Sequence, residues 1–194
     1  MDHIEAIENG IKDKVAYNEI VRKVYLSYPS LILSEEKERG FMICDAISRH
    51  FDIPIMAIKV AGSAQIGRSL HKCRDFQPKC SDLDIAIIEP RLFRKYTELV
   101  FNNTRGYSDR SKFPNRQGES KAGEYMDYIL KGIFRADLMP SCPERAEWDE
   151  FFGELTRKNS DLFKSINAAV YMSQTFFESK QRSIIKFHKD KQGI

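Results

Sequence analysis

Apolar residues recur at helical spacing near both ends of the chain. Over residues 3–27, isoleucines and valines recur mostly three or four positions apart with charged residues between them, which predicts an amphipathic helix. A turn at Pro29 ends this helix, and a second helix is predicted over 34–51. Residues 143–189 are again helical in pattern and predict two helices with a break near Asn159.

The middle of the chain contains short apolar runs that end at glycine or proline. Residues 55–61 stop at Gly62, residues 83–88 are followed by Pro90, and an apolar run within 129–139 stops before Pro140. Runs of this length between turn residues predict buried strands. The remaining segments are predicted as helices over 64–70 and 91–102 and as polar loops over 71–81 and 103–123.

This order of helices and strands predicts an α/β (α+β) fold with a small mixed sheet. A length of 194 residues fits one domain. We therefore expect residues 1–194 to form a single domain with a core of about 55–140, around which helices within 3–51 and 143–189 pack.

Composition narrows the class of protein. Hydrophobic residues make up 42% of the chain, charged residues 30%, and the net charge is +3. These values are typical of a soluble globular protein and argue against wholesale coating of nucleic acid. The chain has no run of about 20 apolar residues and no secretory pattern at its start, so we expect a cytoplasmic protein without a membrane partner. Four cysteines without a CxxC pair are expected to be reduced thiols.

Asp82 and Asp84 lie at the start of the predicted strand 83–88. Alternate residues of a strand point to the same side, so these two carboxylates are expected to share a face. Neighbouring carboxylates repel each other and cost stability unless a cation lies between them. A hard divalent ion such as Mg²⁺ takes oxygen ligands and would relieve this repulsion. The alternative is a solvated strand entrance.

Gly62 and Ser63 lie directly between a predicted strand and a predicted helix. Glycine allows a phosphate to approach the backbone closely, and the first N–H groups of a helix bind anions. The Ser63 hydroxyl can donate one more hydrogen bond. A tight turn without a ligand is the alternative, because strand–glycine–helix turns occur in many folds.

Asp137 is the lone acid in the apolar run of the third predicted strand. It is expected to share a face with Ile133 and Arg135. If this strand lies beside the strand of Asp82 and Asp84, Asp137 brings a third carboxylate to the same ion site. A surface ion pair between Arg135 and Asp137 is the alternative.

Together, Gly62-Ser63, then Ser81-Asp82-Leu83-Asp84, then Asp137 resemble the DNA polymerase β nucleotidyltransferase superfamily. The pattern is similar to the minimal nucleotidyltransferases and to the cyclic-oligonucleotide synthases of bacterial antiphage defence. The resemblance covers about residues 55–140. It departs from the family in a longer segment at 71–80 and in a short C-terminal region.

The resemblance implies a fold, a reaction and a set of site residues. Asp82, Asp84 and Asp137 would be catalytic and hold two Mg²⁺ ions, for which Mn²⁺ could substitute, and an NTP or dNTP would lose pyrophosphate. Gly62 and Ser63 would hold its β- and γ-phosphates. Further nucleotide contacts are expected from Arg68, Lys72 and Ser81.

The acceptor of the nucleotide stays open at this stage. A second nucleotide would yield an oligonucleotide or cyclic product, and a partner protein such as an effector or toxin from the same operon would be nucleotidylated. Nucleic acid could be the product or the acceptor, and the basic segment 103–121 could guide a strand. A non-catalytic nucleotide-binding module is the alternative from a different functional class.

Overall fold

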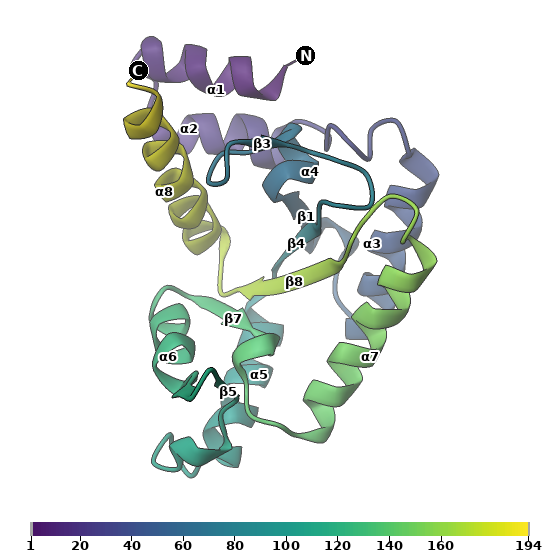
Figure 1. Ribbon diagram of the computed structural model, residues 1–194, viewed down its shortest axis with the longest axis vertical. Helices are drawn as coiled ribbons and strands as arrows, with labels where there is room; N and C mark the ends of the chain where they lie inside the picture. Colours follow the sequence, from purple (N-terminus) through teal and green to yellow (C-terminus); the bar gives the residue numbers. More distant parts are fainter. Residues whose placement is uncertain (1, 194) are drawn as a thin grey trace.

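The protein is described here by a computed structural model of residues 2–193. It is a mixed α/β structure with eight α-helices and a small four-stranded mixed sheet (Figure 1). The sheet order is β1-β4-β8-β7, in which β4 and β8 are parallel and the outer pairs are antiparallel. The strands are β1 (Ile58–Ala61), β4 (Leu83–Ile88), β7 (Ile133–Arg135) and β8 (Ile166–Tyr171).

The helices occupy both ends of the chain and the connections between strands. None of the helices in residues 2–193 has an apolar stretch long enough to cross a bilayer. The α-helices are α1 (His3–Lys12), α2 (Tyr17–Val21), α3 (Lys37–Phe51), α4 (Gly62–Ile66), α5 (Pro90–Asn103), α6 (Ala122–Leu130), α7 (Pro143–Lys158) and α8 (Gln174–Gln192). A π-helix, η1 (Arg22–Ser27), follows α2, and 3₁₀ turns occur at η2 (Ile55–Ala57), η3 (Arg110–Lys112) and η4 (Ala136–Leu138).

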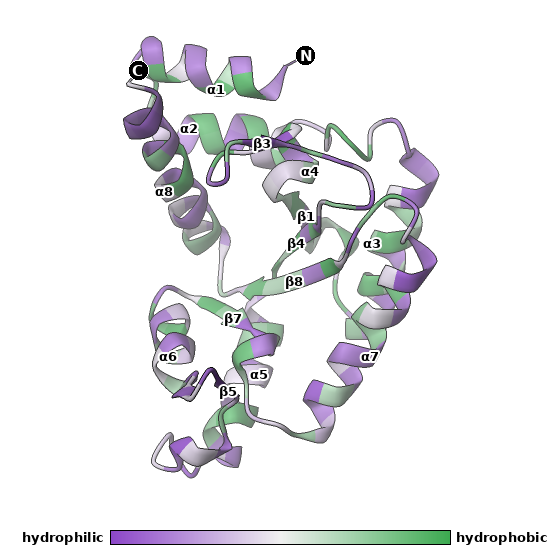
Figure 2. Ribbon diagram, viewed as in Figure 1, coloured by the Kyte–Doolittle hydropathy of each residue, from purple (hydrophilic) through white to green (hydrophobic). Residues whose placement is uncertain are grey.

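Alternation along the strands divides the core into two layers. Leu83, Ile85 and Ile87 point to one face of the sheet and join a buried cluster with residues of α3, α5 and α7. Ala86 and Tyr171 point to the other face and pack with residues of α1, α2 and α8. The strands are accordingly largely apolar, whereas α7 and α8 alternate between apolar and hydrophilic residues (Figure 2).

The predicted helices over 143–189 are wrong in one part, because residues 166–171 form the central strand β8. The break at Asn159 is correct, but it leads through a turn into a strand that pairs on both sides. Ile166, Val170 and Tyr171 are buried β-formers. Long helical patterns on either side mask so short a strand, since six residues span less than two helical turns.

Other segments also differ from their predictions. The predicted helix over 3–27 is interrupted after α1, where Lys14 adopts a positive φ of 57°. The predicted helix over 64–70 starts earlier and stops at Gly67, after which β2 (Arg68–Ser69) pairs with β3 (Arg74–Asp75). In place of the one strand predicted within 129–139, α6 extends to Leu130, β7 has three residues, and η4 contains Asp137.

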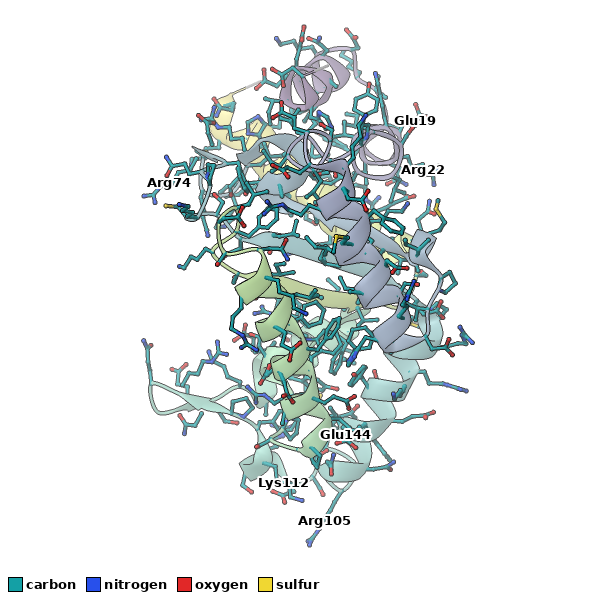
Figure 3. All side chains as sticks on the ribbon, turned by 90° about the vertical axis from the view of Figure 1, so that its right-hand side faces the viewer. Glu19, Arg22, Arg74, Arg105, Lys112 and Glu144 are labelled. Atoms are coloured by element: carbon teal, nitrogen blue, oxygen red, sulfur yellow. The ribbon has the colours of Figure 1, made fainter. Side chains whose placement is uncertain are left out.

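The segment 103–121, predicted as a loop, consists mainly of turns and contains the 3₁₀ turn η3 and a small hairpin. Its strands β5 (Asn115–Arg116) and β6 (Glu119–Ser120) pair antiparallel and precede α6. Its basic residues do not gather at one site. Arg105 and Lys112 lie at the lower end of the molecule, where Arg105 extends into solvent (Figure 3), whereas Arg116 contacts Asp137 at 3.6 Å.

Candidate active site

A cavity of about 700 Å³ lies where β1, β4, β7 and β8 meet the helices α7 and α8. Its wall includes backbone and carboxylates from the sheet and cationic side chains from the surrounding elements. The polar and glycine residues most relevant to chemistry are Gly62, Asp84, Arg116, Arg135, Asp137, Asn167 and Lys180.

Gly62 shapes the first wall of this cavity. It follows the last residue of β1, Ala61, which pairs with Asp84 across the antiparallel ladder. Gly62 has a φ of 61°, and a Cβ atom at this position would collide with the carboxylate of Asp84. The turn therefore requires glycine for its conformation and for the space that Asp84 occupies.

Asp84 carries the most perturbed carboxylate of the site. Its pKa is raised to about 6, first because the surrounding protein removes part of its hydration and second because of the nearby Asp82. Lys72 and Arg135 act in the opposite direction and lower this pKa. Solvent still reaches the carboxylate from the cavity. A cation beside Asp84 would therefore stabilise the charged form of its carboxylate.

Asp82 is held by a chain of hydrogen bonds from β8. The Ser165 hydroxyl donates to Asp82 Oδ1 at 2.7 Å, and the Asn167 amide donates to Ser165 Oγ at 2.8 Å. This chain orients Asp82 beside Asp84 and occupies only one of its carboxylate oxygens. The remaining oxygen and the Asp84 carboxylate are available to a ligand.

The register of the sheet aligns the polar residues across three elements. Asp84 pairs with Asn167 across the parallel β4–β8 ladder, and Arg135 pairs with Ala169 across the antiparallel β7–β8 ladder. The β7–β8 ladder ends at Arg135, and Asp137 follows in the 3₁₀ turn η4. The strand before Asp137 was expected beside the strand of Asp82 and Asp84. That prediction is wrong, because β8 separates β4 from β7.

Asp137 nevertheless reaches the same cavity as Asp84. Arg135 donates two hydrogen bonds to the Asp137 carboxylate, at 3.0 and 2.8 Å, and Arg116 lies 3.6 Å from it. A bidentate pair of this kind is stronger than a single ionic contact. The Arg135–Asp137 ion pair, expected as the alternative at the sequence level, is thus present within the site.

The fit of these carboxylates to a metal ion is partial. No group of three or more histidine, cysteine or acidic residues is arranged to hold a metal within residues 2–193. The Asp82–Asp84 pair provides hard oxygen donors whose mutual repulsion a divalent cation would relieve. Asp137 could join this pair only after leaving Arg135.

The other predicted nucleotide contacts lie in different places. Lys72 is exposed but close enough to lower the pKa of Asp84. Arg68 contacts Asp75 at 3.6 Å and lines another cavity. Ser81 Oγ accepts a hydrogen bond from the backbone N–H of Gln77. Ser63 is half-buried in α4, whose five residues give only a small helix dipole.

No protein-family model, curated protein or solved structure matches the chain. The chemistry of the cavity has to be argued from its own residues. Of these, Arg116, Ser165, Asn167 and Lys180 were missed as site residues at the sequence level. The alternation of polar Ser165 and Asn167 with apolar Ile166 and Ala168 is a strand signal that could have indicated the first pair.

Replacement of Gly62 by alanine tests the close packing against Asp84. We expect Gly62→Ala to lower the free energy of unfolding by about 3 kcal/mol, because both a strained φ and an overpacked contact are introduced. Gly118→Ala is the control, since Gly118 also has a positive φ but has nothing within 4 Å of the place that a Cβ atom would take. This control should lose about 1 kcal/mol. Equal losses in urea unfolding would contradict the predicted packing.

The raised pKa of Asp84 predicts an unusual dependence of stability on pH. Asp84 binds a proton more tightly in the folded protein, at a pKa of about 6 against 3.8, so this stabilisation is lost as pH rises through 6. Without divalent cations, Asp84→Asn should melt about 2–4 °C above the wild type at pH 7.5, corresponding to about 1 kcal/mol because solvent screens this carboxylate.

The same comparison at pH 4.5 supplies the control. The wild-type Asp84 is then mostly protonated, so the melting difference between the two proteins should shrink toward zero. A difference that stays constant between the two pH values would show that Asp84 has an ordinary pKa.

Proposed function

We propose that this protein is a Mg²⁺-dependent nucleotidyltransferase that transfers a nucleoside monophosphate from an NTP or dNTP to a hydroxyl acceptor and releases pyrophosphate. The observation that carries the proposal is Asp84, which has Asp82 near it and lies next to the Gly62 turn, in a cavity that Asp137 also lines. The polymerase β-like core and the cytoplasmic location belong to this proposal.

The charge distribution supports a nucleotide as the ligand. Asp84 has a raised pKa of about 6 and lies opposite a backbone turn that has no side chain in the way. Arg116, Arg135 and Lys180 line the same cavity and would contact phosphate oxygens. Carboxylates and cations in one cavity suit a ligand that arrives as a metal-bound polyphosphate.

Each residue then has a defined task. Asp82 and Asp84 would hold the divalent cation, which when bound stabilises charge on the attacking and leaving oxygens. Ser165 and Asn167 keep Asp82 oriented. Asp137, once released from Arg135, would accept the proton of the attacking hydroxyl.

The direct test is incubation with each α-³²P-labelled NTP and dNTP in the presence of Mg²⁺ or Mn²⁺. We expect label in an oligonucleotide, cyclic or protein-bound fraction, and Asp84→Asn should lower its rate of formation by about 100-fold or more. Asp137→Asn should lower it in the same way. Asp127→Asn is the matched control, because Asp127 is an exposed acid on α6 outside the cavity lining.

Label transfer at the wild-type rate by Asp84→Asn would contradict the proposal. The fraction that contains the label also identifies the acceptor, including a partner protein if one is added from the same operon. One observation favours the non-catalytic nucleotide-binding module, namely that Arg135 holds Asp137 in a bidentate pair. That module would raise the melting temperature with nucleotide and Mg²⁺ but transfer no label.

A further inference from the structure

Three cationic side chains converge on one tyrosine at the edge of the cavity. The Arg135 guanidinium lies 4.7 Å from the centre of the Tyr128 ring, and the amino groups of Lys131 and Lys180 lie 5.8 and 6.0 Å from it. The three come from separate elements, namely β7, the end of α6 and the start of α8. Lys131 is three residues from Tyr128 in the chain, whereas the packing of α8 brings the distant Lys180 to the same ring.

This convergence is held in place by packing between α6, β7 and α8. The turn at Gly132 leaves no room for a side chain, because the Phe176 ring of α8 lies against it. The backbone N–H of Met172 donates to the Gly132 carbonyl at 2.9 Å. In Figure 1, α8 lies above and α6 lies below the end of the sheet at which β7 and β8 pair.

Among the three cations of this cluster, the nearby acids pair with Arg135. Asp137 pairs with Arg135 and Arg116, and Glu124 pairs with Lys121 and contacts Arg135 at 3.5 Å. Within the described chain, Lys131 and Lys180 have no carboxylate at ion-pair distance. A cation–π contact contributes only about 0.5–1 kcal/mol at an exposed site. This is a small stabilisation compared with the repulsion of three like charges brought together.

We propose that Tyr128, Lys131, Arg135 and Lys180 form a binding site for the phosphate chain of a di- or triphosphate ligand. Several adjacent cations match a chain of phosphates better than a single carboxylate does, since each phosphate supplies several acceptor oxygens. Lys180 and Arg135 also line the cavity that contains Asp84. Only the identity of the physiological ligand rests on the proposed function.

The site also has a consequence for Asp137. Arg135 is the one cation of the cluster that is bound to the Asp137 carboxylate. A phosphate chain bound at Lys131 and Lys180 would compete for the Arg135 guanidinium. Binding of the anion would then weaken the hold of Arg135 on Asp137 and free a carboxylate oxygen toward the cavity.

Binding of inorganic tripolyphosphate, measured by calorimetry in EDTA at low ionic strength, tests the site without metal or turnover. The affinity of the double variant Lys131→Ala/Lys180→Ala should fall about ten-fold or more relative to the wild type. The control is Lys95→Ala/Lys186→Ala, which removes the same charge from lysines that each lie 5.7 Å from a tyrosine ring outside the cavity. This control should bind with less than a two-fold change.

Equal affinities of the three proteins, or equal losses in both double variants, would overturn the proposed site. The Lys131→Gln/Lys180→Gln variant provides a second measurement, since it keeps long polar side chains and should lose affinity as the alanine variant does. Tripolyphosphate binding that depends on these lysines in a protein without transferase activity would retain the phosphate site and reject the proposed reaction.

Discussion

The parallel pairing of β4 with β8 is the constraint on which the rest of the site depends. It sets Asp84 beside Asn167, and it brings Ser165 to Asp82. The antiparallel pairing of β7 on the other side of β8 then brings Arg135 and Asp137 to the same end of the sheet. A shift of one residue in either register would turn the polar residues toward the opposite layer.

The same pairing explains why charged residues can sit beside a largely apolar core. Leu83, Ile85 and Ile87 pack into the apolar layer formed with α3, α5 and α7. The opposite face of β4 can therefore carry Asp84. The small Gly62 leaves space for its carboxylate. The resulting repulsion with Asp82 is a stability cost of the kind that functional sites bear.

The sequence predicted those strands and helices whose ends are marked by glycine or proline. Strands β1 and β4 were located because Gly62 and Pro90 mark their ends, and α5 because Pro90 starts it. Strand β8 was missed because a six-residue run within a long helical pattern carries little local signal. The separation of β4 and β7 by β8 is a non-local pairing that no spacing in the chain encodes.

The candidate site was predicted in part. Asp84 and Gly62 lie together as the strand–turn pattern suggested. Asp137, in contrast, reaches the cavity from a 3₁₀ turn and is hydrogen-bonded to Arg135. Lys180 could not be assigned from the sequence, because its role depends on how α8 packs near α6.

Asp82 and Asp84 are proposed to form a divalent-cation site, and a Mn²⁺ titration followed by electron paramagnetic resonance tests this central claim most directly. Without nucleotide, the wild type should bind Mn²⁺, and Asp82→Asn and Asp84→Asn should each lose that binding. Asp137→Asn should retain it, because Arg135 already occupies the Asp137 carboxylate. Equal Mn²⁺ binding by the wild type and Asp84→Asn would contradict the claim.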